Sequence, residues 1–137
     1  MVKPDIRNDK DIKLLVHTFY GKVQDDERLG YIFNDYAEVD WDYHMPRMVD
    51  FWSNLLFRTG RYDGKPFSQH LPLPIEKDDF HRWYNLFVET VDCCFEGDRA
   101  EYTKEMAGKI AASFTLRMEM EGKFDDIEGN RNYDGQK

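Results

Sequence analysis

Four side chains with polar tips stand in largely apolar stretches of this 137-residue sequence: Tyr20 in HTFYGKV, His44 in DYHMPRM, His70 in PFSQHLP and Trp83 in FHRWYNLF. A neutral histidine nitrogen can bind an iron atom, and a hydroxyl, an imidazole or an indole N–H can donate a hydrogen bond to a small ligand. Donors of this kind act most strongly where the surrounding side chains exclude water. These four residues are therefore the main candidates for chemistry.

Four stretches of the chain have apolar residues at the three- and four-residue spacing of an amphipathic helix. Their stripes are Ile12, Leu15, Val16, Phe19 and Val23; Trp41, His44, Met48, Phe51, Trp52 and Leu55; Phe80, Trp83, Tyr84, Phe87, Val91 and Cys94; and Met106, Ile110, Phe114 and Met118. The first helix is expected to begin near Asn8 or Asp9. No alternating strand pattern occurs, so the sequence predicts an all-α domain.

Proline and glycine limit where these helices can extend. Pro46 has no backbone N–H and disfavours helical geometry at the residue before it, so the second helix is expected to begin at Pro46 or to have an irregular first turn. His44 would then lie at or just before the start of the helix. Between residues 59 and 74, two glycines and three prolines leave room only for a short helical turn around Phe67 to His70.

Length, charge and cysteine content narrow the class of protein. A chain of this length forms one domain that buries about two-thirds of its unfolded surface, and we expect a globular domain over 1–121 and a polar, disordered tail over 122–137. The two adjacent cysteines, Cys93 and Cys94, neither clamp distant segments nor give a zinc-binding spacing. A net charge of -8 gives no electrostatic attraction for nucleic acid. No stretch reaches the roughly 18 apolar residues of a membrane span, so the sequence predicts a cytoplasmic protein that binds neither nucleic acid nor membrane.

The motifs around the four polar side chains resemble the haem pocket of the group III truncated haemoglobins. The resemblance runs from about Ile12 to Phe114 and includes the block FWSNLLFRTGRYDGKPFSQHLPLP. It implies a two-over-two globin fold, which helical periodicity alone does not distinguish from a four-helix bundle. It also implies one haem b, which would be held without a covalent bond because the chain lacks a CxxCH motif.

The same resemblance implies a role for each of the four residues. His70 would be the proximal ligand of the haem iron, presented from its short breaker-rich segment. Tyr20, His44 and Trp83 would lie on the distal side and donate hydrogen bonds to a bound diatomic gas. The other two histidines of the chain, His17 and His81, fall on no motif position and are interpreted as structural.

Further residues are expected around the haem. Phe33 matches the globin phenylalanine that packs on the haem face, and the walls are expected to come from Met48, Phe51, Trp52, Phe80 and Phe87. The two haem propionates need cations or donors at the pocket mouth. The candidates closest in sequence to the pocket motifs are Arg47, Tyr62, Lys65 and Arg82.

Several distal donors favour slow loss of dioxygen, and hence oxygen or peroxide activation or nitric oxide oxidation over bulk transport. The expected ligands are dioxygen, carbon monoxide and nitric oxide, and a reductase of unknown identity is the expected partner. Nitric oxide dioxygenase and peroxidase-like activity both stay open, although a neutral histidine pushes less electron density onto iron than a thiolate does. The alternatives are a haem-free helical interaction module, in which the aromatic residues only form a core, and a haem-based sensor.

Overall fold

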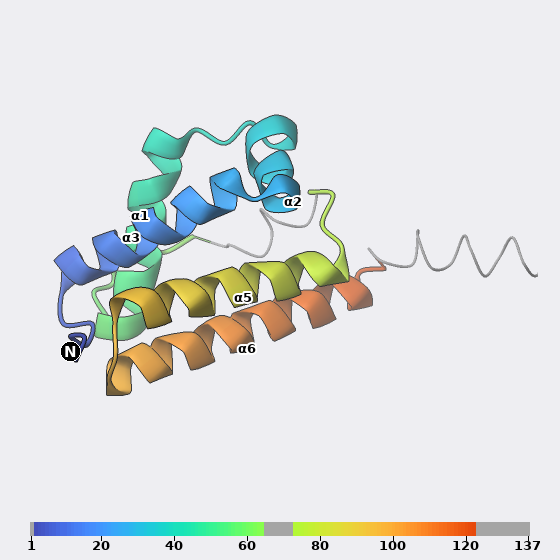
Figure 1. Cartoon of the computed structure of the whole chain (residues 1–137). Coiled ribbons are helices and arrows are strands. Elements are labelled where there is room, and N and C mark those ends of the chain that lie inside the picture. Colours follow the sequence, from blue (N-terminus) through green and yellow to red (C-terminus); the bar gives the residue numbers. More distant parts are fainter. Residues whose placement is uncertain (1, 65–72, 123–137) are drawn as a thin grey trace, which may run out of the picture.

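The structure is a computed structural model that describes residues 2–64 and 73–122 (Figure 1). All regular elements within these ranges are helical, which confirms the predicted all-α class. They are α1 (Asp9–Asp25), α2 (Glu27–Gly30), the π-helix η1 (Tyr31–Tyr36), α3 (Trp41–Phe57), α5 (Lys77–Cys94) and α6 (Asp98–Met120). The candidate residues Lys65 and His70, and all but the first residue of the 122–137 tail, lie outside the described residues.

The long helices form two layers (Figure 1). Helices α5 and α6 run antiparallel and side by side, while α1 and α3 cross each other in the second layer. Helix α1 contacts both α3 and α5, so it is the element that joins the layers. This is the two-over-two arrangement that the sequence was expected to adopt.

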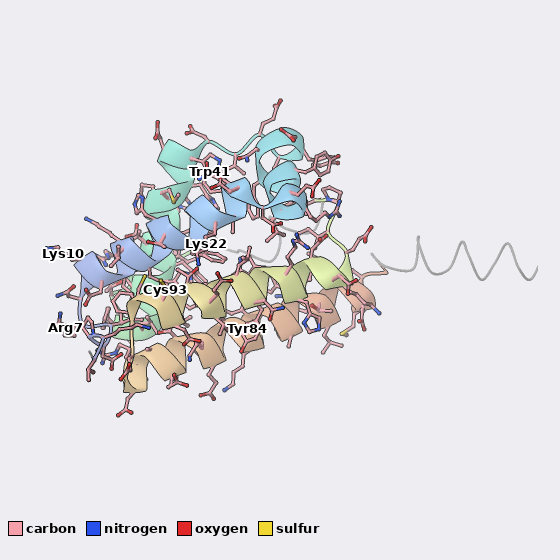
Figure 2. The ribbon with its side chains drawn as sticks, viewed as in Figure 1. Arg7, Lys10, Lys22, Trp41, Tyr84 and Cys93 are labelled. Atoms are coloured by element: carbon pink, nitrogen blue, oxygen red, sulfur yellow. The ribbon has the colours of Figure 1, made fainter. Side chains whose placement is uncertain are left out.

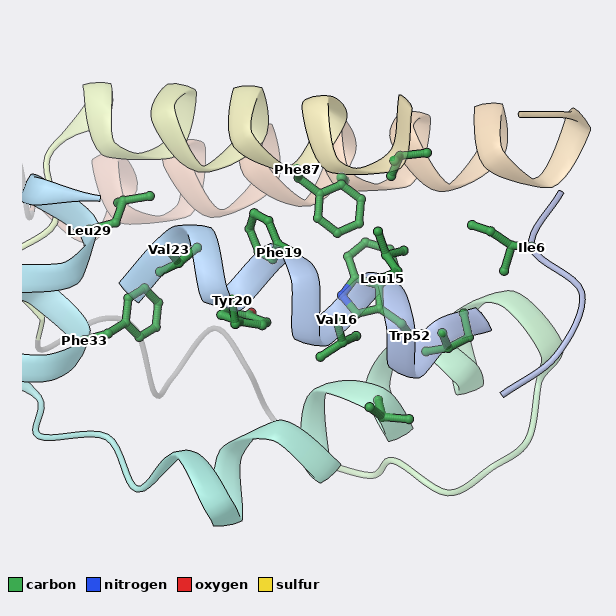
Figure 3. Packing of buried hydrophobic residues seen from close by; sticks show 14 of the residues in the cluster. Ile6, Leu15, Val16, Phe19, Tyr20, Val23, Leu29, Phe33, Trp52 and Phe87 are labelled. Carbon is green, nitrogen blue, oxygen red and sulfur yellow. The ribbon is translucent and has the colours of Figure 1, made fainter. Parts of the chain in front are cut away.

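Helix α1 lies at the centre of the core because every residue of its apolar stripe is buried. The predicted stripe residues Ile12, Leu15, Val16, Phe19 and Val23 are all buried, and Figure 3 shows Phe87 of α5 beside Phe19 between the layers. The Phe19 ring meets the Phe87 ring edge-on at a centroid distance of 5.0 Å. Edge-to-face pairs of this kind add stabilisation beyond the burial of apolar area.

Side-chain caps set where α1 and α3 begin. The side chain of Asn8 accepts a hydrogen bond from the backbone N–H of Asp11, so α1 begins at Asp9 as predicted. Helix α3 begins earlier than expected, because the Asp40 carboxylate accepts bonds from the backbone of residues 42 and 43. Pro46 therefore lies inside α3. The carbonyl that it leaves without a helical donor belongs to residue 42, which is exposed to water.

The N-terminal segment ties down the turn between α5 and α6. The Asp5 carboxylate accepts hydrogen bonds from the backbone N–H groups of Arg99 and Ala100, at 2.9 and 2.8 Å, and so caps α6 from a distant part of the chain. Gly97 has φ +141°, and a Cβ at this position would lie 2.6 Å from the Asp5 carboxyl carbon. Only glycine allows this approach of the two segments.

A partly buried ion pair between Arg28 and Asp79 fixes the start of α5. Asp79 is 6% exposed and accepts hydrogen bonds from Arg28 Nε and Nη2 at 3.0 and 2.9 Å. Its carboxylate also accepts the backbone N–H of Glu76, which completes a capping box at the N-terminus of α5. Arg28 Nη2 donates in addition to the carbonyl of Pro74. The pair thus joins α2, α5 and the chain that leads into α5.

Candidate functional site

A cavity lies between the two helical layers, with about 840 Å³ of free space inside it and at its mouth. Helices α1, α2, α3, α5 and α6 and the π-helix η1 all contribute to its lining. The lining is largely apolar, and its few polar groups include the side chains of Tyr20, His44, Asp79 and Trp83.

Tyr20 brings a hydroxyl into this apolar cavity from α1. The residue is 4% exposed, and burial raises the pKa of its hydroxyl well above the usual value of a tyrosine, while a hydrogen bond from Trp83 lowers that pKa in part. Because an indole N–H only donates, Trp83 is the donor in this bond and the Tyr20 oxygen is the acceptor. The bond leaves the hydroxyl proton of Tyr20 for donation to another group.

His44 lies beside Tyr20 on the neighbouring helix α3. The imidazole meets the Tyr20 ring edge-on, with 5.3 Å between centroids, and lies 6.2 Å from the ring of Phe33. The three expected distal residues therefore come from three helices and line one cavity.

Most of the expected wall residues line the cavity, namely Phe33, Met48, Phe51, Trp52 and Phe80. Phe87 is not among the lining residues. Its ring lies behind the wall, stacked on Trp52 at 4.8 Å and on Trp83 at 5.6 Å. Phe87 thus supports two lining residues and belongs to the core, contrary to the expectation from the sequence.

Two of the expected propionate partners lie together. The Arg47 guanidinium lies 5.6 Å from the centroid of the Tyr43 ring and 5.2 Å from that of the Tyr62 ring. A Cβ on Gly64 would come within 2.7 Å of Arg47 Nη2 and within 2.5 Å of the Tyr62 hydroxyl. Glycine at this position lets the backbone pass close to both side chains.

Arg82 lies elsewhere, on α5. Its Nε donates to both carboxylate oxygens of Asp26, at 2.9 and 2.7 Å, and Asp26 is the N-cap of α2. This exposed pair joins α2 to α5 on the surface. The described residues thus bring Arg47 and Tyr62 together, and they place Arg82 apart from them in an ion pair with Asp26.

Several lining residues were not singled out from the sequence. Ile110 and Phe114 belong to the predicted stripe of α6, but helical spacing could not tell that they face a cavity. Asp79 was noted only as an acidic residue favourable near a helix N-terminus. Its burial depends on Arg28, and no signal in a single sequence pairs these two positions.

The chain is similar to proteins of one family. It is 32% identical over 111 residues to the group 3 truncated hemoglobin ctb of Campylobacter jejuni, and the match covers 78% of this chain and 87% of that protein. This chain belongs to the group III truncated haemoglobins. A crystal structure of a group III truncated hemoglobin from the same species matches with a TM-score of 0.78 and 30% identity, over 85% of this chain and 95% of that one. No protein-family model matches the chain.

Membership of the truncated haemoglobins agrees with the family expected from the sequence motifs, and it does not favour a haem-free interaction module. Within the described parts of the chain, no helix is both long and apolar enough to span a membrane.

Proposed function

We propose that this truncated haemoglobin binds haem b in the cavity, with His70 as the iron ligand, and holds a diatomic gas beside Tyr20, His44 and Trp83. The observation that carries the proposal is that the buried Tyr20 hydroxyl and the Trp83 indole, from two different helices, line one apolar cavity. If these residues only formed a hydrophobic core, the core would not require two polar groups from different helices at this place.

The described residues fit a flat apolar group with an acidic edge. The cavity is largely apolar, and aromatic rings such as those of Phe33, Phe51 and Trp52 line it. Arg47 and Tyr62 lie together on the α3 side and offer a guanidinium and a hydroxyl to a carboxylate. We propose these two as propionate partners, and Lys65 and Arg82 stay candidates from the sequence.

When bound, haem supplies an iron atom that takes up dioxygen, carbon monoxide or nitric oxide. The protein supplies the hydrogen-bond donors. Tyrosine is neutral at physiological pH, and burial raises the pKa of Tyr20 further, so the hydroxyl remains a donor, and the Trp83 N–H bond orients it. His44 adds an imidazole on the same side. Donors fixed in a low-dielectric cavity stabilise negative charge on a ligand more strongly than water does.

Such a donor set favours slow release of dioxygen, so we propose oxygen or peroxide activation or nitric oxide oxidation as the role, and not bulk transport. Nitric oxide oxidation consumes electrons at each turnover, which calls for a reductase partner in the cytoplasm. A role as a haem-based sensor would need a separate partner protein.

Absorption spectra of the ferric, ferrous and carbon monoxide forms test the proposal. We expect a red protein with a Soret band that shifts on reduction and again on addition of carbon monoxide. A colourless protein that cannot be reconstituted with haem would contradict it. Rapid mixing of the dioxygen-loaded ferrous protein with nitric oxide or with peroxide then separates the two proposed activities, because only the first should yield nitrate.

A further inference from the structure

A surface groove follows the seam between α1 and α3, on the outer side of the layer that covers the cavity. Lys13 and His17 line it from α1, and Met45 and Val49 line it from α3. Trp41, at the start of α3, is also part of its lining. In Figure 2, Trp41 is labelled where the first turn of α3 passes α1.

The Trp41 side chain lies between this groove and the cavity. Its ring lies 5.4 Å from that of His44, 5.7 Å from that of Tyr20 and 5.8 Å from that of Phe33, measured between centroids. All three neighbours line the cavity, whereas Trp41 lines the groove. One half-buried indole thus stands between the groove and two of the distal residues.

The indole is held by a hydrogen bond at the protein surface. Trp41 Nε1–H donates to Asn34 Oδ1 at 2.8 Å, and the amide of Asn34 donates in turn to the carbonyl of Gln24 at 3.4 Å. Asn34 is exposed, so water can replace it as the acceptor when the indole moves. The bond therefore acts as a latch that can open at modest cost.

We propose that Trp41 is the gate of a passage from the α1/α3 groove to the distal side of the cavity, and that Asn34 holds the gate closed. This inference rests on the proposed function, because the molecules that pass are the diatomic ligands of the haem. A gate made of one indole admits small uncharged gases when it opens and keeps larger solutes out. Trp41 is thus a residue that determines which ligands reach the site, and it does not itself touch them when closed.

The first test measures the latch and does not depend on haem. The Trp41 indole N–H should exchange with solvent deuterium about two- to tenfold faster in Asn34→Ala, since a neutral hydrogen bond of this kind contributes about that factor. Asn34→Asp keeps an acceptor oxygen and should restore slow exchange. Asn54→Ala removes a different side-chain acceptor, which takes the N–H of Gly60 at the other end of α3, and should leave this exchange unchanged. Equal exchange in Asn34→Ala and the parent protein would overturn the latch.

The second test measures passage through the gate in the haem-loaded protein. Carbon monoxide that enters and carbon monoxide that leaves would cross the same energy barrier at Trp41. Asn34→Ala lowers that barrier, so it should speed association and dissociation of carbon monoxide by the same factor, about two- to tenfold. The equilibrium affinity and the infrared stretching band of bound carbon monoxide should not change. Trp41→Ala should speed both rates further.

The results separate the gate from the proposed function. Faster indole exchange in Asn34→Ala with unchanged carbon monoxide rates would overturn the gate while leaving haem binding intact. A change in affinity or in the infrared band would also overturn it, because it would mean that the latch alters the ligand site itself. A chain that binds no haem would refute the proposed function, and xenon exchange with the cavity in the same variants, followed by NMR, would then decide whether Trp41 gates it.

Discussion

The indole N–H of Trp83 donates a hydrogen bond to the hydroxyl of Tyr20, which links α5 to α1 inside the cavity. The two groups did not have to pair with each other, because each could have donated a hydrogen bond to a backbone carbonyl instead. The bond couples the two residues, and in the proposed site the Tyr20 hydroxyl keeps a proton that it can donate to a ligand.

For this unit we expect a larger effect on dioxygen than on carbon monoxide, because dioxygen draws more negative charge from iron. Losing a hydrogen bond to a charged acceptor costs about 1.5 to 3 kcal/mol, so Tyr20→Phe should speed dioxygen dissociation by about ten- to a hundredfold. Trp83→Phe removes a bond to the neutral Tyr20 hydroxyl and should speed it by about two- to tenfold. The double variant should show less than the summed effect, because the residues are coupled. Stopped-flow rates for both gases measure this, and equal changes for the two gases would point to altered access.

Alkaline pH should destabilise the fold through Tyr20. Its pKa is raised in the folded protein, chiefly by burial, above the value of about 10 in the unfolded chain. The stabilisation is therefore fully present below about pH 10 and is lost as the pH rises further, by up to about 1.4 kcal/mol per pH unit. Urea unfolding should show a weaker pH dependence above pH 10 in Tyr20→Phe. The matched variant Tyr102→Phe, which removes an exposed hydroxyl, should behave as the parent protein.

Replacement of the proposed iron ligand should release the haem. We expect His70→Ala to lose haem or its five-coordinate ferrous spectrum, since no other histidine is placed by motif to replace the bond. External imidazole should restore part of the spectrum. An unchanged histidine–iron stretching band in the ferrous variant would rule out His70 as the ligand.

Arg47→Ala should speed haem loss modestly, because a partly exposed charged pair is worth about 0.2 to 1 kcal/mol. Haem transfer to an acceptor globin gives the rate. Lys109→Ala, which removes an exposed charge paired with Glu105 on α6, provides the control and should leave the rate unchanged. The same assay on Arg82→Ala tests whether that residue contributes at all, and an unaltered rate in Arg47→Ala would remove it from the propionate site.

The remote cap of α6 should contribute measurable stability. Burial raises the pKa of Asp5, but its bonds to backbone N–H groups outweigh this and leave the pKa below the usual value. Its contribution is therefore present above about pH 4 and is lost as the pH falls below that. Asp5→Ala should lower the unfolding free energy at neutral pH by about 0.5 to 2 kcal/mol. Asp35→Ala, which removes an exposed carboxylate from η1, should have little effect in the same urea titration.

Helical periodicity was enough to predict the long helices and their buried faces, because residues such as Ile12 and Phe19 repeat at the spacing that one helix face requires. The stripe that starts at Trp41 also matches helix α3, whereas the expected start at Pro46 was wrong, because the Asp40 side chain caps the helix at Trp41, ahead of the proline ring, and Pro46 lies in an exposed turn. The expectation that Phe87 forms a wall of the cavity was wrong, because helical spacing gives the face of a residue and not its depth behind Trp52 and Trp83.

The arrangement of the candidate site needed more than periodicity. The family motifs pointed to Tyr20, His44 and Trp83, which the fold brings to one cavity. The Trp41 to Asn34 bond and the Arg28 to Asp79 pair could not be predicted, because they join side chains from separate elements whose relative placement only the packed fold defines.

All three tryptophans of the chain lie at or next to the cavity: Trp52 and Trp83 line it, and Trp41 packs on two residues that do. A haem in the cavity would absorb the light that these indoles emit, so the loaded protein should be almost dark in fluorescence and the emptied protein bright. The tryptophan fluorescence intensity of a solution would then report the fraction of molecules that hold no haem. Intrinsic tryptophan fluorescence would thus measure haem occupancy, and haem loading or loss could be followed without an added label.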